Sequence, residues 1–189
     1  MKNIAIFASG SGTNAENIIR HFSTRKSAKV VAVFVNNPQA GVIKRVTGTG
    51  TGVIVFDRAG LYESGMVMER LTEMGVDLIV LAGFLWHIPA PITVRYEGRL
   101  VNIHPALLPG FGGKGMYGDR VHRAVIDSGS DKTGITIHYV NEVYDAGDII
   151  FQAECPVLPG DTPQTLADRV HALEYRYYPT VIEEIIEKL

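Results

Sequence analysis

Two polar residues follow a short apolar run near the middle of the chain, and their types suit proton transfer and oxyanion chemistry. Asn102 and His104 lie two positions apart, so on a β-strand both side chains would point to the same face. Prolines and glycines beyond them end the strand, which places both groups at its open C-terminal end. An amide donor beside a titratable donor suits an oxygen that becomes negative during a reaction. The alternative is a strand end whose polar groups satisfy the following turn.

A second candidate site is a glycine-containing segment close to the N-terminus. It joins the first apolar run to a helical pattern, so its backbone N–H groups and the helix N-terminus suit an anion. The segment also matches a relaxed dinucleotide fingerprint, but the second predicted strand ends at 35–38 without the carboxylate that would hold a ribose. The sequence therefore predicts a monophosphate site, with a plain strand-to-helix turn as the alternative. The residues are Gly10, Ser11, Gly12, Thr13 and Asn14.

Short apolar runs alternate with helical patterns through the first hundred residues. The runs are rich in Val, Ile and Leu, which is typical of buried parallel strands. Such alternation predicts a parallel sheet with helices on both faces and ligands at the carboxyl ends of its strands. The predicted strands are 4–8, 30–35, 53–56, 78–82 and 100–103, and the predicted helices are 15–22, 41–48, 62–74 and 90–96.

The pattern changes after residue 130. Two strand-like runs, 133–140 and 148–157, are joined by too few residues for a helix, so they should pair as an antiparallel hairpin. The tail 162–189 is helical, with Thr162 as N-cap, and Pro179 should kink it or split it in two. The predicted fold class is α/β: a single doubly wound, mostly parallel sheet with helices on both faces and a C-terminal antiparallel hairpin.

Composition favours one globular, cytoplasmic domain spanning 1–189. Hydrophobic residues make up 46% of the chain, and the net charge of −2 without charge runs argues against nucleic acid as a partner. The single cysteine, Cys155, cannot form an internal disulfide, which fits a reducing cytosol. The first apolar run is too short for a signal peptide, and no run reaches the length of a membrane span. His21, His122 and His171 have no partner at a metal-ligand spacing, so no metal is expected.

Four blocks in one order resemble the folate-dependent formyltransferases, over residues 4 to 183. They are the glycine segment at 10–14, residues 80–84, the Asn/His block at 102–109, and Asp145-Ala146-Gly147. The resemblance is strongest to the branch of that family that acts in purine synthesis. It implies an enzyme that transfers a formyl group from the co-substrate 10-formyltetrahydrofolate to the amine of glycinamide ribonucleotide.

The resemblance also assigns roles to individual residues. Asn102 and His104 would donate hydrogen bonds to the oxyanion, Asp145 would orient His104 and favour its charged form, and the segment 10–14 would hold the substrate phosphate. Gly83 and Glu174 would contact the ribonucleotide, although a charged helix residue such as Glu174 is ordinarily solvated. His138 has a supporting or a purely structural role. The folate ring would lie against Phe84, Leu85, Trp86, His87 and Ile88, where many members of the family have Met-Arg in place of Leu85-Trp86.

The glycine-rich segment 110–118 is not a nucleotide-binding loop, because Leu108 stands where the Walker pattern requires glycine. We expect a mobile loop beside the active site, a few residues longer than in related proteins.

Four other functions need to be weighed. Methionyl-tRNA and sugar-nucleotide formyltransferases share the Asn/His/Asp set but have a further C-terminal domain, and formyltetrahydrofolate hydrolase has an extra N-terminal domain; neither is expected here. A nucleotide- or folate-binding protein without activity would need the cleft but not all three polar groups. The expected partners are therefore the two small-molecule substrates, and the sequence leaves the oligomeric state open.

Overall fold

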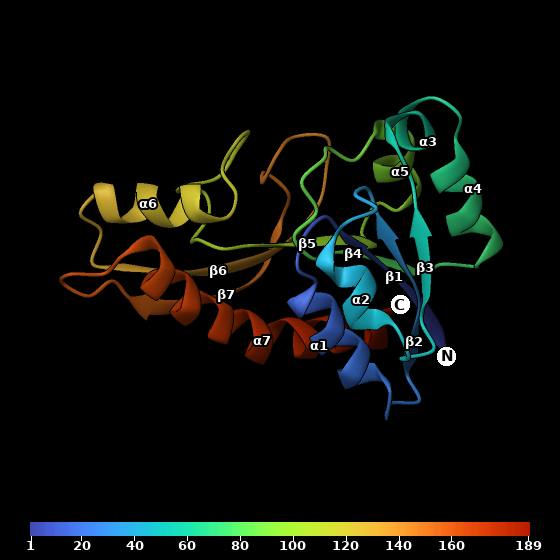
Figure 1. Cartoon of the computed structure of the whole chain (residues 1–189), viewed down its shortest axis with the longest axis horizontal. Helices are drawn as coiled ribbons and strands as arrows, with labels where there is room; N and C mark the ends of the chain where they lie inside the picture. Colours follow the sequence, from blue (N-terminus) through green and yellow to red (C-terminus); the bar gives the residue numbers. More distant parts are fainter.

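One mixed sheet organises the whole protein, and a computed structural model describes it over all 189 residues (Figure 1). Its seven strands lie in the order β3-β2-β1-β4-β5-β6-β7. The first five are parallel, whereas β6 is antiparallel to both β5 and β7. The predicted fold class is therefore confirmed. The strands are β1 (Lys2–Ala8), β2 (Ala28–Val35), β3 (Gly52–Val55), β4 (Leu78–Leu81), β5 (Leu100–His104), β6 (Lys132–Tyr139) and β7 (Ile149–Pro156).

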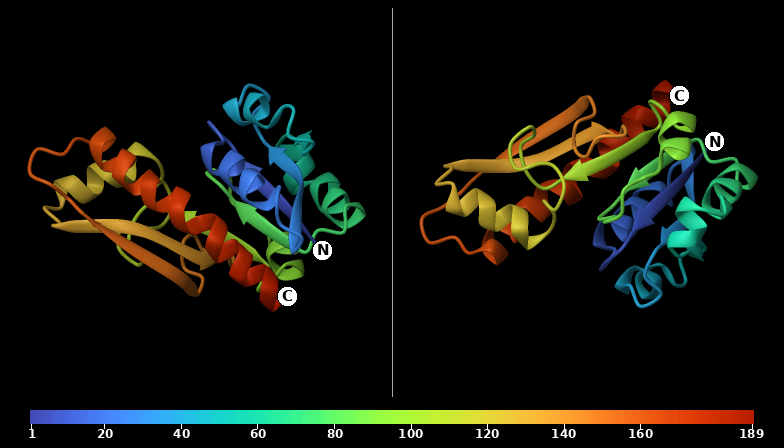
Figure 2. Two further views of the ribbon diagram at one scale, coloured as in Figure 1. Left: turned by 90° about the horizontal axis from the view of Figure 1, so that it is seen from below. Right: turned by 90° about the horizontal axis from the view of Figure 1, so that it is seen from above.

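Helices cover both faces of the sheet, as Figures 1 and 2 show. Helices α1, α2 and α7 pack on one face in a core of 27 buried residues, and α3, α4 and α5 pack on the other in a core of 15. Helix α6 lies beside the N-terminal half of α7. The helices are α1 (Thr13–Phe22), α2 (Gly41–Val46), α3 (Arg58–Tyr62), α4 (Met66–Glu73), α5 (Ala90–Arg95), α6 (Asp119–Asp127) and α7 (Pro163–Lys188).

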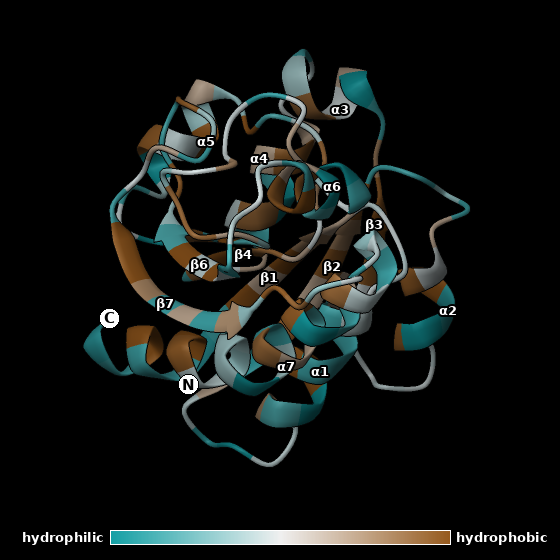
Figure 3. Ribbon diagram, turned by 90° about the vertical axis from the view of Figure 1, so that its left-hand side faces the viewer, coloured by the Kyte–Doolittle hydropathy of each residue, from teal (hydrophilic) through white to brown (hydrophobic).

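The central strands supply both cores because successive side chains point to opposite faces. In β1, Ile4 and Ile6 belong to the larger core, whereas Ala5 and Phe7 belong to the smaller one. All four are fully buried, and burying a side chain such as Ile or Phe contributes about 1.5–3 kcal/mol. Figure 3 shows β1 and β2 as apolar strands surrounded by helices that are polar on their outer sides. The two-sided burial fixes where these strands end, and therefore where the pocket opens.

The single helix predicted over 62–74 is wrong. The segment forms two short helices, α3 and α4, and the second begins after Gly65, which has a φ of 73°. A left-handed residue ends the regular hydrogen-bond pattern, and glycine adopts that conformation without steric cost. The first helix also begins earlier than predicted, because the carboxylate of Asp57 caps it by accepting the N–H of Gly60.

Pro179 does not split the terminal helix, contrary to one of the two predicted outcomes. Helix α7 runs for 26 residues through Pro179, and Figure 2 shows it without a break. Proline leaves the carbonyl four residues earlier without its helical donor. Here that carbonyl, of Tyr175, accepts a hydrogen bond from Nδ2 of Asn17 at 2.8 Å. Helix α1 therefore satisfies the group that the proline leaves free.

No helix has the combination of length and apolar character that crossing a membrane requires.

Candidate active site

A pocket of about 640 Å³ opens where the strands of the parallel sheet end. Every candidate residue named from the sequence lines it, from the glycine segment at 10–14 to Glu174 on α7. The carboxyl ends of β1, β4 and β5 meet at this edge, which is where ligands bind in open α/β sheets. The topology thus brings together groups that lie up to 164 residues apart in the sequence, namely Gly10 and Glu174.

The side chain of Asn102 is held by His138 from the neighbouring strand. The β5–β6 register places the two residues directly opposite each other. Nδ1 of His138 lies 2.8 Å from the carbonyl oxygen of Tyr139, which can only accept, so Nδ1 carries a hydrogen. Nε2 then accepts a hydrogen bond from Nδ2 of Asn102 at 3.2 Å. Burial lowers the pKa of His138, which favours this neutral form. The arrangement fixes the orientation of the Asn102 amide.

His104 is nearly fully buried, and both ring nitrogens face polar groups. Nε2 donates to the carbonyl oxygen of Phe111 at 2.8 Å. Nδ1 lies 3.6 Å from Oδ2 of Asp145, which is longer than a hydrogen bond but within the range of an ion pair when the ring is protonated. The other carboxylate oxygen, Oδ1, lies 3.7 Å from Nε2 of His138. The carboxylate of Asp145 therefore stands between the two imidazoles.

The backbone around these groups is unusual. Asp145 and Phe111 are the two non-glycine residues with positive φ, at 53° and 56°, a conformation that is uncommon outside glycine. Oδ2 of Asp145 also accepts the N–H of Gly113 at 2.9 Å. The glycine-rich loop 110–118 is thus attached to both His104 and Asp145 through its backbone. It borders the pocket, as expected from the sequence.

The glycine segment leaves the N-terminus of α1 open to the pocket. Gly12 is the N-cap residue, has a φ of 78°, and provides no side chain to cap the helix, so the N–H groups of the first turn have no side-chain partner. A Cβ atom on Gly12 would lie 2.3 Å from Cγ2 of Val42, whereas one on Gly10 would meet nothing within 4 Å. Gly12 is therefore required by packing, and Gly10 borders open space where a ligand can approach.

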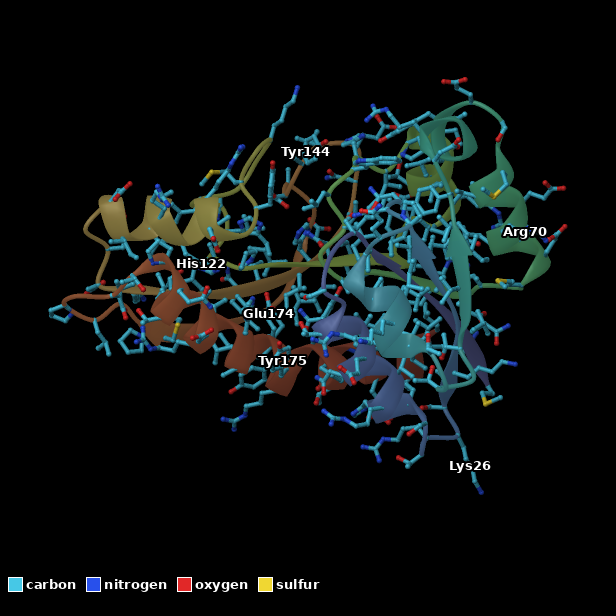
Figure 4. All side chains as sticks on the ribbon, in the orientation of Figure 1. Lys26, Arg70, His122, Tyr144, Glu174 and Tyr175 are labelled. Carbon is cyan, nitrogen blue, oxygen red and sulfur yellow. The ribbon has the colours of Figure 1, made fainter.

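Glu174 joins α7 to the same end of the pocket. Its carboxyl group is buried, with 6% of the residue exposed, and Oε2 accepts a hydrogen bond from Nδ2 of Asn14 at 2.8 Å. Burial raises the pKa of Glu174. Oδ1 of Asn14 is buried without a partner. Figure 4 shows Glu174 between α7 and the sheet rather than on the outer side of the helix, so it is not a solvated surface residue.

The segment 83–88 forms the other, more apolar end of the pocket. Phe84 packs edge-on against Phe7 with 5.3 Å between ring centroids. Trp86 is half-buried between Phe56 and Tyr62, and the guanidinium of Arg58 lies 5.2 Å from its ring. Ile88 is buried, whereas Leu85 is half exposed. This end therefore offers flat apolar surfaces.

His87 ties this apolar end to the β6–β7 loop. Its Nε2 lies 3.0 Å from the carbonyl oxygen of Glu142, and its ring packs on Tyr144 with 4.7 Å between centroids. The segment 83–88 and the loop that carries Asp145 therefore form one continuous wall.

Sequence reasoning missed one wall of the pocket. Helix α6 was not predicted, yet Arg120 and His122 on it line the pocket, as does Lys114 of the preceding loop. The sequence did carry a signal for this helix, because Val121 and Val125 are spaced four apart, as on one face of a helix. Both are buried in the structure. His171 of α7 also lines the pocket. No three His, Cys, Asp or Glu side chains are grouped as a metal site.

Fold and site define an open α/β-sheet protein whose ligand pocket combines an anion-binding helix end with an amide, an imidazole and a carboxylate. The model of the family described as formyl transferase matches residues 2–182. The chain belongs to this formyl transferase family.

Curated relatives agree with that assignment. The chain is 41% identical over 194 residues to the chloroplastic phosphoribosylglycinamide formyltransferase of Arabidopsis thaliana, covering 99% of this chain but 66% of that protein. It is 34% identical over 192 residues to the phosphoribosylglycinamide formyltransferase of Bacillus subtilis, covering 98% of this chain and 95% of the relative. The chain thus spans just under two thirds of the plant protein and nearly all of the bacterial one.

Solved structures show the same fold. The glycinamide ribonucleotide transformylase 1 of Symbiobacterium toebii superposes with a TM-score of 0.91 at 34% identity, and the match covers 100% of this chain and 89% of that one. The likeness therefore extends to the antiparallel strands that carry His138 and lead to Asp145.

Proposed function

We propose that this protein transfers a formyl group from 10-formyltetrahydrofolate to the amine of glycinamide ribonucleotide, a step of purine biosynthesis. One observation carries the proposal. A single pocket holds an uncapped helix N-terminus for a phosphate together with the Asn102, His104 and Asp145 side chains. The names of the relatives support this choice of substrates.

The reaction needs no covalent intermediate on the protein. The substrate amine attacks the formyl carbon on N10 of the folate, a C–N bond forms, and the formyl oxygen becomes an oxyanion. The Asn102 amide and the protonated imidazole of His104 each donate an N–H to this oxyanion, and both interactions strengthen as negative charge develops. The C–N10 bond then breaks, N10 takes up a proton, and the former amine nitrogen loses one. Protonated His104 supplies the proton to N10, and Asp145 relays the amine proton through water.

His138 has a positioning role in this scheme. Because its Nε2 accepts one N–H of the Asn102 amide, the second N–H of that amide remains for the substrate. Its neutral form also keeps a second positive charge away from His104, whose own charge the scheme requires.

Substrate binding must release His104 from the loop. Nε2 of His104 donates to Phe111 in the free protein, so this N–H reaches the substrate only after the Phe111 carbonyl moves away. The glycines that follow Phe111 in loop 110–118 give the backbone the freedom for that shift. We propose that loop 110–118 makes this movement when the substrates bind.

The two ends of the pocket take different substrates in this proposal. The phosphate lies at the α1 N-terminus, and Gly83 and Glu174 contact the rest of the ribonucleotide. The folate ring lies against the segment 84–88, where apolar surfaces gather. Asn102, His104 and Asp145 lie between these ends, where the amine and the formyl group meet.

The acceptor decides between this function and its closest competitors. The purified protein should be mixed with 10-formyltetrahydrofolate and, in turn, glycinamide ribonucleotide, methionyl-tRNA or an amino-sugar nucleotide, and the products identified by mass spectrometry. We expect formylation of glycinamide ribonucleotide alone. Formylation of the tRNA or of the sugar nucleotide in its place would reject the proposed acceptor while keeping the formyl transfer.

We further propose that the enzyme acts in the cytoplasm and without a metal. Asn102 and His104 already supply the donors for the oxyanion, so the chemistry does not call for a Lewis acid. Full activity after dialysis against a chelator is the expected result, and loss of activity that a divalent cation restores would contradict it.

A further inference from the structure

His122 on α6 is a polar residue where packing calls for an apolar one. Only 2% of the residue is exposed, and Val121 and Val125 beside it are fully buried. Its Nδ1 atom is buried and has no hydrogen-bond partner. A buried polar atom without a partner destabilises a protein, because it has lost its hydrogen bonds to water and gained none in return. The same residue lines the substrate pocket, so a turn of the imidazole ring would bring this nitrogen to a ligand bound there.

The groups that face His122 are mostly basic. His171 approaches it from α7 and His104 from β5, and after burial, the largest cause, both lower its pKa. On its own helix, Arg120 also lines the pocket, and Asp119 is the acid that acts in the opposite direction. Two further charged residues, Lys114 of the loop and Glu174 of α7, line the same pocket.

This basic group has little negative charge to balance it. The carboxyl groups of the pocket already have partners, because Glu174 accepts a hydrogen bond from Asn14 and Asp145 lies between His104 and His138. An anion bound in this part of the pocket would therefore meet mainly N–H donors and basic side chains.

The position of α6 indicates which anion this is. The hydrogen bond between Glu174 and Asn14 places α7 directly beside the glycine segment, and α6 packs against α7. In Figure 4, His122 lies on the side of α6 that is turned toward α7. His122 and the glycine segment line the same pocket, and the phosphate is the only charged group of the proposed acceptor apart from the reacting amine.

We propose that His122 binds the phosphate of the ribonucleotide, opposite the backbone N–H groups of the glycine segment. The inference rests on the proposed function, because it takes the phosphorylated acceptor as the ligand. A phosphate oxygen accepts the imidazole N–H, a charge-assisted hydrogen bond of the stronger kind. The buried histidine is then retained for binding at the expense of stability, a trade-off that functional sites commonly show.

The test combines affinity with stability for His122→Leu. Calorimetry should measure binding of glycinamide ribonucleotide, of its dephosphorylated ribonucleoside, and of a non-reactive folate analogue. We expect the variant to lose about tenfold or more in affinity for the ribonucleotide, as expected for a charge-assisted hydrogen bond, and to bind the other two ligands as the wild type does. Its Tm should equal or exceed that of the wild type, because leucine removes the unpartnered nitrogen.

Matched variants distinguish the loss of the His122 hydrogen-bond donor from a change in side-chain packing. His122→Asn and His122→Gln place an amide donor near the position of Nδ1 or Nε2, and at least one should bind the ribonucleotide more tightly than His122→Leu. His21→Gln is the control, because His21 pairs with Glu183 outside the pocket, and it should leave all three affinities unchanged.

Three results would overturn the inference: an unchanged ribonucleotide affinity in His122→Leu, an equal loss for the ribonucleoside, or a lower Tm with no rescue by either amide. Failure of the wild-type protein to bind the ribonucleotide at all would instead reject the proposed function.

Discussion

At the scale of single residues, the site is defined by which nitrogen atoms of its side chains carry a hydrogen. The Tyr139 carbonyl forces a hydrogen onto Nδ1 of His138, and this leaves Nε2 to accept from Asn102. The amide of Asn102 can then present its remaining N–H in one direction only. The spacing of Asn102 and His104 predicted that they share a face of one strand. It did not predict the partner of Asn102, because that depends on the register between β5 and β6.

Asn102→Ala should lower kcat by roughly 10²–10³, the usual loss for one oxyanion donor. His104→Ala and Asp145→Ala should also be severe, and the losses in a triple variant should not add, because the three groups act as a unit. Steady-state kinetics on correctly folded proteins gives these values. Near-normal turnover in any one of the single variants would remove that residue from the mechanism.

Trp86 is the only tryptophan and packs where the folate ring is proposed to bind. A non-reactive folate analogue should change its emission saturably, after correction for the analogue's own absorbance, because the ring enters the environment of Phe84 and Trp86. The ribonucleotide alone should change the emission little. An unchanged signal with calorimetrically confirmed binding of the analogue would show that Trp86 only packs against Phe56 and Tyr62.

At the scale of elements, the junction between β1 and α1 shows how one segment serves packing and binding with different residues. Gly12 allows α2 to approach, since a side chain there would meet the backbone and side chain of Val42. Gly10 has no such neighbour. The sequence pattern predicted the glycines of an anion site but not which of them supports the fold.

Gly10→Val should therefore weaken binding of the ribonucleotide, with little effect on folate affinity or on Tm. The new side chain enters only the space in front of the helix N-terminus. Gly12→Val should lower the Tm strongly, since it combines a left-handed φ with a clash against Val42. Thermal unfolding and equilibrium binding of each substrate check both expectations. If Gly10→Val weakened folate binding more than ribonucleotide binding, the two ends of the pocket would have been assigned backwards.

The elements that sequence reasoning predicted well are those with a simple hydrophobic period. All seven strands and the terminal helix were predicted, because continuous apolar runs and a capped helix start are local signals. Two features were not predicted. The break between α3 and α4 depends on the backbone conformation of Gly65, and α6 has only a narrow apolar stripe that follows a glycine-rich loop. Pro179 stays within α7, where Asn17, a residue 162 positions away, donates to the carbonyl that the proline leaves free.

At the scale of the whole molecule, burial of two histidines links stability to pH. Burial lowers the pKa values of His122 and His138 below the ordinary value of 6.5. The unfolded chain therefore binds more protons than the folded one as the pH falls below 6.5, so stability is full above this pH and is lost as the medium becomes more acidic. Glu174 acts in the opposite direction, because its raised pKa lets the folded state hold a proton above pH 4.5.

We expect the free energy of unfolding to fall with decreasing pH below about 6.5, and His122→Leu and His138→Gln each to reduce that fall. Urea denaturation of the wild type and both variants between about pH 5 and 8 measures it. An identical pH dependence in all three proteins would show that neither histidine resists protonation in the folded state.

The pocket itself emerges only at the scale of the whole chain. Sequence motifs indicated most of its parts but not the wall formed by α6, and the meeting of these parts depends on right-handed crossovers and on the position of α7 across the sheet. The contacts that involve the least predictable segments, Phe111 with His104 and Gly113 with Asp145, could not be inferred from spacing. Because of these contacts, the glycine-rich loop must move before His104 can donate to the substrate.

The measurement that tests the central claim most directly is the dependence of folate deformylation on the acceptor. Pure protein is mixed with 10-formyltetrahydrofolate, and release of tetrahydrofolate is followed with and without glycinamide ribonucleotide. The account predicts release only when the ribonucleotide is present, with one formylated product formed for each folate released. Equal release in its absence would mean that water is the acceptor, and the pocket would then belong to a hydrolase.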